Sequence, residues 1–144
     1  MKKDILRQRK KIYQQGNAII RKFSMCSIDV KLNLFKTYCT SMYTAHLWCR
    51  YRSTSNNRGA MSKLYVAYHN TLKMFVGVSK FERNSILCAY MNIPNCAGII
   101  RNFINKFVHR IKDSNNPIIV ALVNAGFDNS SCMWMKWREL TYVN

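Results

Sequence analysis

The acidic side chains are the first candidates for chemistry, and the chain has only six of them against 23 lysines and arginines. Four fall at predicted helix starts or breaks, where capping and turns explain them: Asp4, Asp29, Asp113 and Asp128. Glu82 and Glu139 are isolated, so no two acids lie close in sequence as paired catalytic carboxylates often do. The chain also has no nucleophile elbow, phosphate loop or HExxH motif. Its own residues therefore predict no complete enzyme.

Cysteine and histidine could hold a metal. The chain has six cysteines and no CxxC pair, and we expect small buried thiols in a reducing compartment: Cys26, Cys39, Cys49, Cys88, Cys96 and Cys132. The alternative is a zinc site made of Cys39, His46 and Cys49, to which His69 could add a ligand. That spacing fits no standard zinc finger. We therefore expect no metal, and we expect His46, His69 and His109 on helix surfaces or interfaces.

The basic side chains are the strongest signal, because a net charge of +17 and a pI near 10.0 predict a polyanionic partner. Residues 4–23 predict a helix with Ile5, Ile12, Ile19 and Phe23 on one stripe. Its opposite side carries cations with almost no counter-charge, whereas ordinary solvated faces mix signs. We predict that this face follows a phosphate backbone through Lys3, Arg7, Lys10, Lys11, Arg21 and Lys22.

A second basic element is predicted at Arg50, Arg52 and Arg58. Tyr51 lies between the first two, and Arg58 lies within a polar loop over 53–59. Arginine and tyrosine can both stack on bases, so this element suits single strands or duplex ends. A surface loop whose arginine stems lie along apolar neighbours is an equal alternative.

A membrane is the other polyanionic surface. The opening helix could lie on it, but its apolar side has no tryptophan, and the apolar stripes of the later helices need packing partners. No run of 18 apolar residues could span a bilayer, and no apolar segment follows Met1 as in a secretory signal. We therefore expect no membrane partner and an intracellular protein, in the nucleus or cytoplasm.

Hydrophobic periodicity predicts an all-α fold of short, antiparallel-leaning helices in a thumb-like bundle. After the opening helix, Ser27 is a candidate N-cap residue for the second helix. Gly77 is expected to end the third helix. Helices are expected over 60–76, 85–91 and 97–112, and over 118–123, where composition also allows a strand. We divide the chain into a basic thumb-like segment (1–58), a helical extension (59–123) and a tail with a short Trp-containing segment (124–144).

An ordered series of short matches resembles the thumb and C-terminal region of reverse transcriptases from jockey-like, LINE-type non-LTR retrotransposons. The matches cover nearly the whole chain, and no single one is diagnostic. They include DILRQ (4–8), IRKF (20–23), LFKTYC (34–39), LW (47–48), VAYHN (66–70), IIRN (99–102), SSCMW (130–134) and LTYV (140–143).

The resemblance implies a fragment of an RNA-directed DNA polymerase. In the complete family, paired palm aspartates hold divalent metal, expected to be magnesium, but this sequence has no Ala-Asp-Asp motif. We therefore expect no catalysis from this chain alone and no cofactor. The resemblance also implies that the thumb grips template–primer, so the expected partners are RNA or RNA–DNA duplex and the palm and fingers of the polymerase. The charge pattern gives that role to Arg7, Lys10, Lys11, Arg21 and Lys22.

Two alternatives stay open at this point. One is a structural or interaction module without nucleic-acid function, with an apolar seam at Tyr43, Leu47 and Trp48 that would favour association. The other is a decayed open reading frame.

Overall fold

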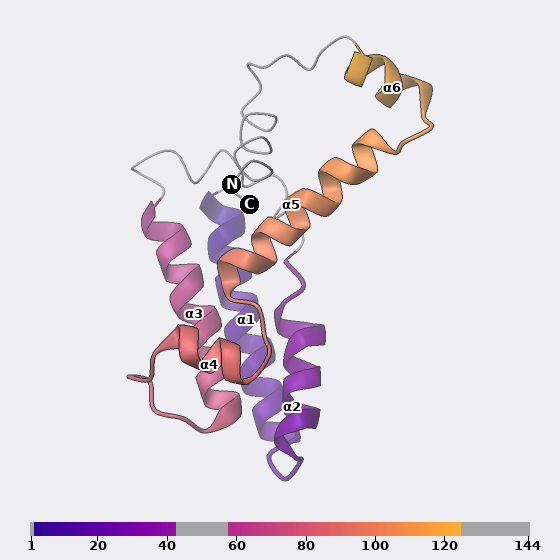
Figure 1. The fold of residues 1–144 in the computed structure, drawn as a ribbon. Coiled ribbons are helices and arrows are strands. Elements are labelled where there is room, and N and C mark those ends of the chain that lie inside the picture. Colours follow the sequence, from indigo (N-terminus) through magenta and orange to yellow (C-terminus); the bar gives the residue numbers. More distant parts are fainter. Residues whose placement is uncertain (1, 43–57, 125–144) are drawn as a thin grey trace.

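The computed structural model describes residues 2–42 and 58–124 (Figure 1). In these two ranges the chain forms helices and no strand, which confirms the all-α fold. The elements are α1 (Lys2–Lys22), α2 (Ile28–Leu34), the π-helical turn η1 (Phe35–Cys39), α3 (Arg58–Val76), α4 (Asn84–Tyr90), α5 (Cys96–Lys112) and α6 (Pro117–Asn124).

The helix boundaries follow the local signals closely. Ser27 precedes α2 as its N-cap residue, although its side chain makes no capping hydrogen bond. Gly77 ends α3 with a φ of +75°, a backbone conformation that glycine adopts without strain. Residues 118–123 lie within α6, so the strand alternative for that segment is wrong.

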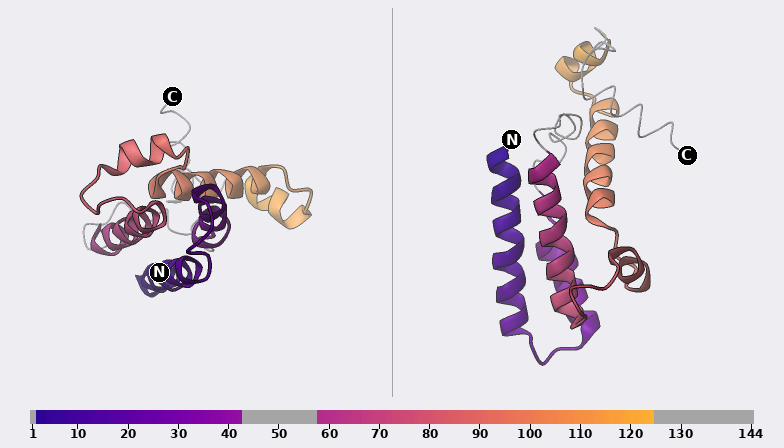
Figure 2. Two further views of the ribbon diagram at one scale, coloured as in Figure 1. Left: turned by 90° about the horizontal axis from the view of Figure 1, so that it is seen from below. Right: turned by 90° about the vertical axis from the view of Figure 1, so that its left-hand side faces the viewer.

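The first three helices form an up–down–up bundle. Successive helices run antiparallel, so α1 and α3 lie side by side and parallel, and they share the most extensive helix contact among the described elements (Figures 1 and 2). The short α4 leads into α5, which runs antiparallel to α3 and carries α6 at its far end (Figure 1). Because α3 packs along α1, contacts cross the expected boundary at residue 58. The division at 58 and 123 stays a prediction.

An aromatic cluster joins the bundle to the C-terminal helices. The ring of Phe35 lies 5.2 Å from that of Tyr68 and 5.3 Å from that of Phe75, in tilted and edge-on geometries that aromatic pairs favour. The hydroxyl of Tyr68 donates a hydrogen bond of 2.8 Å to the carbonyl oxygen of Pro94, just before α5. Burial raises the pKa of this phenol, so it stays protonated and keeps donating.

Gly16 sets the distance between α1 and α3. A Cβ built on this residue would lie well under 3.0 Å from Cγ2 of Thr71, closer than real Cβ atoms come to their neighbours. Thr71 is 1% exposed and β-branched, so its methyl group has no free space to turn into. The glycine on the apolar stripe of α1 therefore lets the two backbones approach closely.

The Gly16→Ala variant is expected to lose stability. Overpacking costs about 1–3 kcal/mol, and better helix propensity offsets only up to ~1 kcal/mol of it. Thr71→Ser removes the opposing methyl group, so the double variant should be less destabilised than the two single effects added together. Urea unfolding of the four proteins measures this coupling. Simple additivity would show that Gly16 and Thr71 do not share this contact.

A buried lysine fixes the loop between α3 and α4. Lys73 is 5% exposed, and its Nζ donates to the carbonyl oxygens of Lys80 at 2.8 Å and Glu82 at 2.6 Å. Charge-assisted hydrogen bonds of this kind are stronger than neutral ones. They hold the loop against α3 and so set where α4 begins.

We expect Lys73→Met to release this loop while keeping the length of the side chain. Loss of the two bonds should raise amide hydrogen exchange over residues 79–83 at least fivefold, on the scale of about 1 kcal/mol per lost hydrogen bond. Lys63→Met, on an exposed position of the same helix, is the matched control and should leave exchange in the loop unchanged. Equal exchange in both variants would contradict this role of Lys73.

Candidate nucleic-acid interface

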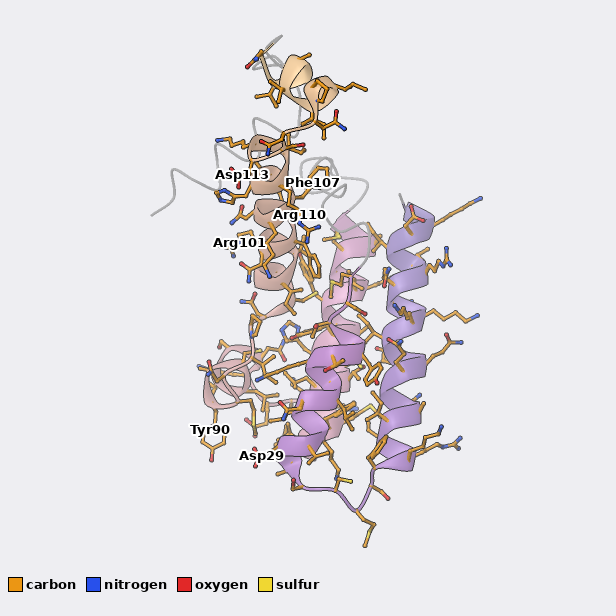
Figure 3. The ribbon with its side chains drawn as sticks, turned by 90° about the vertical axis from the view of Figure 1, so that its right-hand side faces the viewer. Asp29, Tyr90, Arg101, Phe107, Arg110 and Asp113 are labelled. Atoms are coloured by element: carbon orange, nitrogen blue, oxygen red, sulfur yellow. The ribbon has the colours of Figure 1, made fainter. Side chains whose placement is uncertain are left out.

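The outer face of α1 carries the predicted cations. Arg7, Lys10, Arg21 and Lys22 are all exposed, as is Lys3. Their face lies opposite the stripe of buried residues that packs into the bundle: Ile5, Ile12, Gly16 and Ile19. Side chains tipped with nitrogen extend from α1 on the side away from the other helices (Figure 3). The fold therefore leaves this row of positive charge open to solvent.

Two basic residues of α1 have a different environment. Lys11 is only partly exposed. Burial raises the pKa of the Cys39 thiol, and the nearby charge of Lys11 offsets part of that rise. Arg9, which falls on the apolar side of the helix, lies over the ring of Tyr13 with its Cζ 5.9 Å from the ring centroid. This contact resembles a cation–π pair and gives Arg9 a place within the packed side of α1. Lys11 is therefore the weakest of the predicted contacts on this helix.

The second predicted basic element lies largely outside the described residues. Arg50 and Arg52 fall in 43–57, as do His46, Cys49 and the apolar seam at Tyr43, Leu47 and Trp48. Arg58 is the first residue of α3, but the position of its side chain is not described. Binding by these three arginines stays a prediction.

Helix α5 has a second basic face that the sequence analysis missed. The polar side of α5 is exposed, and the helix contains no acid. The basic residues on that side are Arg101, Lys106, His109, Arg110 and Lys112. Three of these lie in the last turn, where the helix dipole favours positive charge. The helix lies on the other side of α3 from α1 (Figure 2), and Arg101 points away from the bundle (Figure 3). The amphipathic pattern of residues 97–112 predicts this basic face as well as the apolar stripe, and the sequence analysis used only the stripe.

The described acids hold no metal site. Asp4 and Asp29 lie in the first turns of α1 and α2, and Asp113 is the C-cap residue of α5. Over 2–42 and 58–124, no three side chains of His, Cys, Asp or Glu come together as metal ligands would. These three aspartates lie at the ends of three different helices, which is not the arrangement of the paired aspartates of a polymerase palm.

Three of the four described cysteines are shielded by the core, whereas Cys26 is only partly buried. Burial raises the pKa of Cys39 and of Cys96 to about 12, and raises that of Cys88 as well. His69 is half-buried, and its Nδ1–H donates to the carbonyl oxygen of Tyr65 at 2.7 Å. Burial also lowers the pKa of His69, which therefore favours the neutral ring. Of the proposed zinc ligands, Cys39 is a buried thiol and His69 is bonded to the backbone of its own helix.

Thiol labelling should follow this burial. Because the thiolate is the reactive form, we expect iodoacetamide at pH 8 to label Cys26 at least tenfold faster than Cys39 or Cys96 in the folded protein. Peptide mapping by mass spectrometry identifies the labelled sites, and unfolding in urea should make the three rates similar. Fast labelling of Cys39 in the native protein would contradict its burial.

No protein-family model, curated protein or solved structure was found to match this chain. Among the helices that the structure describes, none combines the length and the apolar character that crossing a membrane requires.

Proposed function

We propose that this protein binds RNA or RNA–DNA duplex through the phosphate backbone, using the outer face of α1. The observation that carries the proposal is the row of exposed cations at Lys3, Arg7, Lys10, Arg21 and Lys22, opposite the packed stripe of the same helix. Asp4, in the first turn, is the only acid in α1. A face of one sign repels itself in the free protein, and a polyanion relieves that repulsion.

Backbone binding explains why lysine and arginine are spread along α1. Each phosphate contact releases condensed counterions from the nucleic acid, so several exposed cations add affinity without selecting a sequence. The basic face of α5 offers further phosphate contacts on the other side of α3. We therefore expect nucleic-acid binding with little sequence preference and with an affinity that falls steeply as salt rises.

The resemblance to LINE-type reverse transcriptases supports a specific setting for this binding. In that setting the chain is a thumb and C-terminal region, α1 lies along the template–primer, and the palm and fingers are the protein partner. The sequence has no Ala-Asp-Asp motif, so the proposed role of this chain by itself is binding without catalysis.

Neutralising α1 tests the proposed interface. The variant Arg7→Gln, Lys10→Gln, Arg21→Gln and Lys22→Gln keeps good helix formers at exposed positions and leaves out the partly buried Lys11. We expect its affinity for an RNA–DNA duplex to fall at least tenfold in fluorescence anisotropy. We also expect the slope of log affinity against log salt concentration to become shallower by about one for each phosphate contact that is lost.

A charge-matched variant provides the control. Lys36, Lys63, Lys80 and Arg83 are exposed residues outside α1 and α5, and changing all four to glutamine removes the same net charge. Far-UV circular dichroism should be alike for both variants. If the control loses as much affinity as the α1 variant, or if wild-type affinity is indifferent to salt, then α1 is not the binding surface.

A second candidate function is that of an interaction module, and apolar side chains on α4 favour it. Ile86 is 59% exposed and Tyr90 is 83% exposed, and they lie one helical turn apart. Tyr90 points away from the bundle (Figure 3). Changing both to serine should abolish any concentration-dependent association seen by sedimentation velocity. A wild-type protein that stays monomeric at high concentration would contradict self-association through α4.

A further inference from the structure

A small pocket lies between α1 and the segment formed by α2 and η1. Its volume is about 220 Å³. Ile19 and Leu34 form an apolar part of its lining. The other side chains that line it include Gln15, Lys22, Phe23 and Tyr38. Pockets for drug-sized ligands measure about 300–1,000 Å³, so this one has room for a single flat ring system only. Lys22 belongs to the exposed basic row of α1, which places the pocket at the edge of the proposed backbone track.

The polar group in this pocket has no partner within the described protein. Oε1 of Gln15 is buried and accepts no hydrogen bond. A buried acceptor without a donor is costly, commonly about 1–3 kcal/mol, and native structures leave few such groups unsatisfied. No solvent reaches this oxygen as the side chain stands, so a ligand N–H group in the pocket could satisfy it only after the Gln15 amide rotates toward the pocket.

Two aromatic side chains line the same pocket and are open to solvent. Phe23 at the end of α1 is 37% exposed, and Tyr38 on η1 is 50% exposed. Tyr38 lies in the π-helical turn, and half of its surface is accessible. Partly exposed rings beside a basic track are the usual platform for stacking of unpaired bases.

We propose that this pocket takes one unpaired nucleobase from a nucleic acid whose backbone lies on α1. The base stacks on Tyr38 or Phe23, and the Gln15 amide rotates so that its Oε1 accepts a hydrogen bond from an N–H group of the base. Lys22 contacts the adjoining phosphate. The proposal rests on the proposed function, since α1 must hold the strand, and it adds recognition of an unpaired nucleotide to binding that is otherwise indifferent to sequence.

Three RNA duplexes that differ at one nucleotide test the proposal. One is fully paired, one carries a single bulged adenosine, and one carries an abasic residue in the same bulge. The two bulged duplexes have equal backbone charge and similar shape, so only the base distinguishes them. Because stacking of one base on an aromatic ring gives roughly a tenfold gain or more, we expect the bulged adenosine duplex to bind about tenfold tighter than the abasic one.

Variants of the pocket separate base binding from backbone binding. Tyr38→Leu removes the ring, and Gln15→Met removes the acceptor while keeping an unbranched side chain. Each should reduce the preference for adenosine over the abasic bulge at least threefold and leave affinity for the fully paired duplex unchanged. Tyr90→Leu, at an exposed tyrosine on α4, is the matched control and should keep the full preference.

The outcomes distinguish the pocket from the interface. Equal affinity for the adenosine and abasic bulges would overturn the pocket and leave backbone binding by α1 in place. A preference that survives Tyr38→Leu and Gln15→Met together would also overturn it, because the base would then lie elsewhere. If none of the three duplexes binds in a salt-dependent manner, both the proposed function and the pocket fail.

Discussion

The close approach of α1 to α3 at Gly16 and Thr71 is the contact on which the rest of the structure depends. It buries the isoleucine stripe of α1 and so fixes the rotation of that helix about its own axis. Because polar and apolar residues occupy opposite sides of α1, burying one side exposes the other. The basic row therefore faces outward because core packing buries the opposite side of the helix, and no other contact is needed to orient it. The same rotation turns Gln15 and Lys22 toward η1, where the small pocket forms.

The sequence was sufficient for the parts of the molecule that local rules govern. Period-3.6 apolar spacing located α1, α3 and α5, and Gly77 marked the end of α3 because only a residue without Cβ takes a φ of +75° at little cost. The same period predicted which face of α1 carries the cations. It did not predict the contact of Arg9, since only the structure places its guanidinium over the ring of Tyr13.

Features made by residues distant in sequence were beyond such rules. The pocket joins Gln15 of α1 to Tyr38 of η1, and Tyr38 lies in a π-helical turn that no residue type specifies. Lys73 is another case, because a lysine on an amphipathic helix is normally solvated, and only the fold of the loop after Gly77 supplies the two carbonyl oxygens that bury it. The basic face of α5 is different in kind, since its residues follow the period of a single amphipathic helix and depend on no distant partner.

Charge couples the stability of this protein to its proposed ligand. A net charge of +17 on 144 residues destabilises the compact state through self-repulsion, and the exposed cations of α1 and α5 concentrate that cost on two helices. Packing at Gly16, the aromatic cluster of Phe35, Tyr68 and Phe75, and the loop bonds of Lys73 must offset it. A polyanion that binds only the folded arrangement would stabilise it by mass action. The gain would be largest at low salt, where both the repulsion and the binding are strongest. The arrangement that weakens the free protein is therefore the one that makes nucleic acid an effective partner.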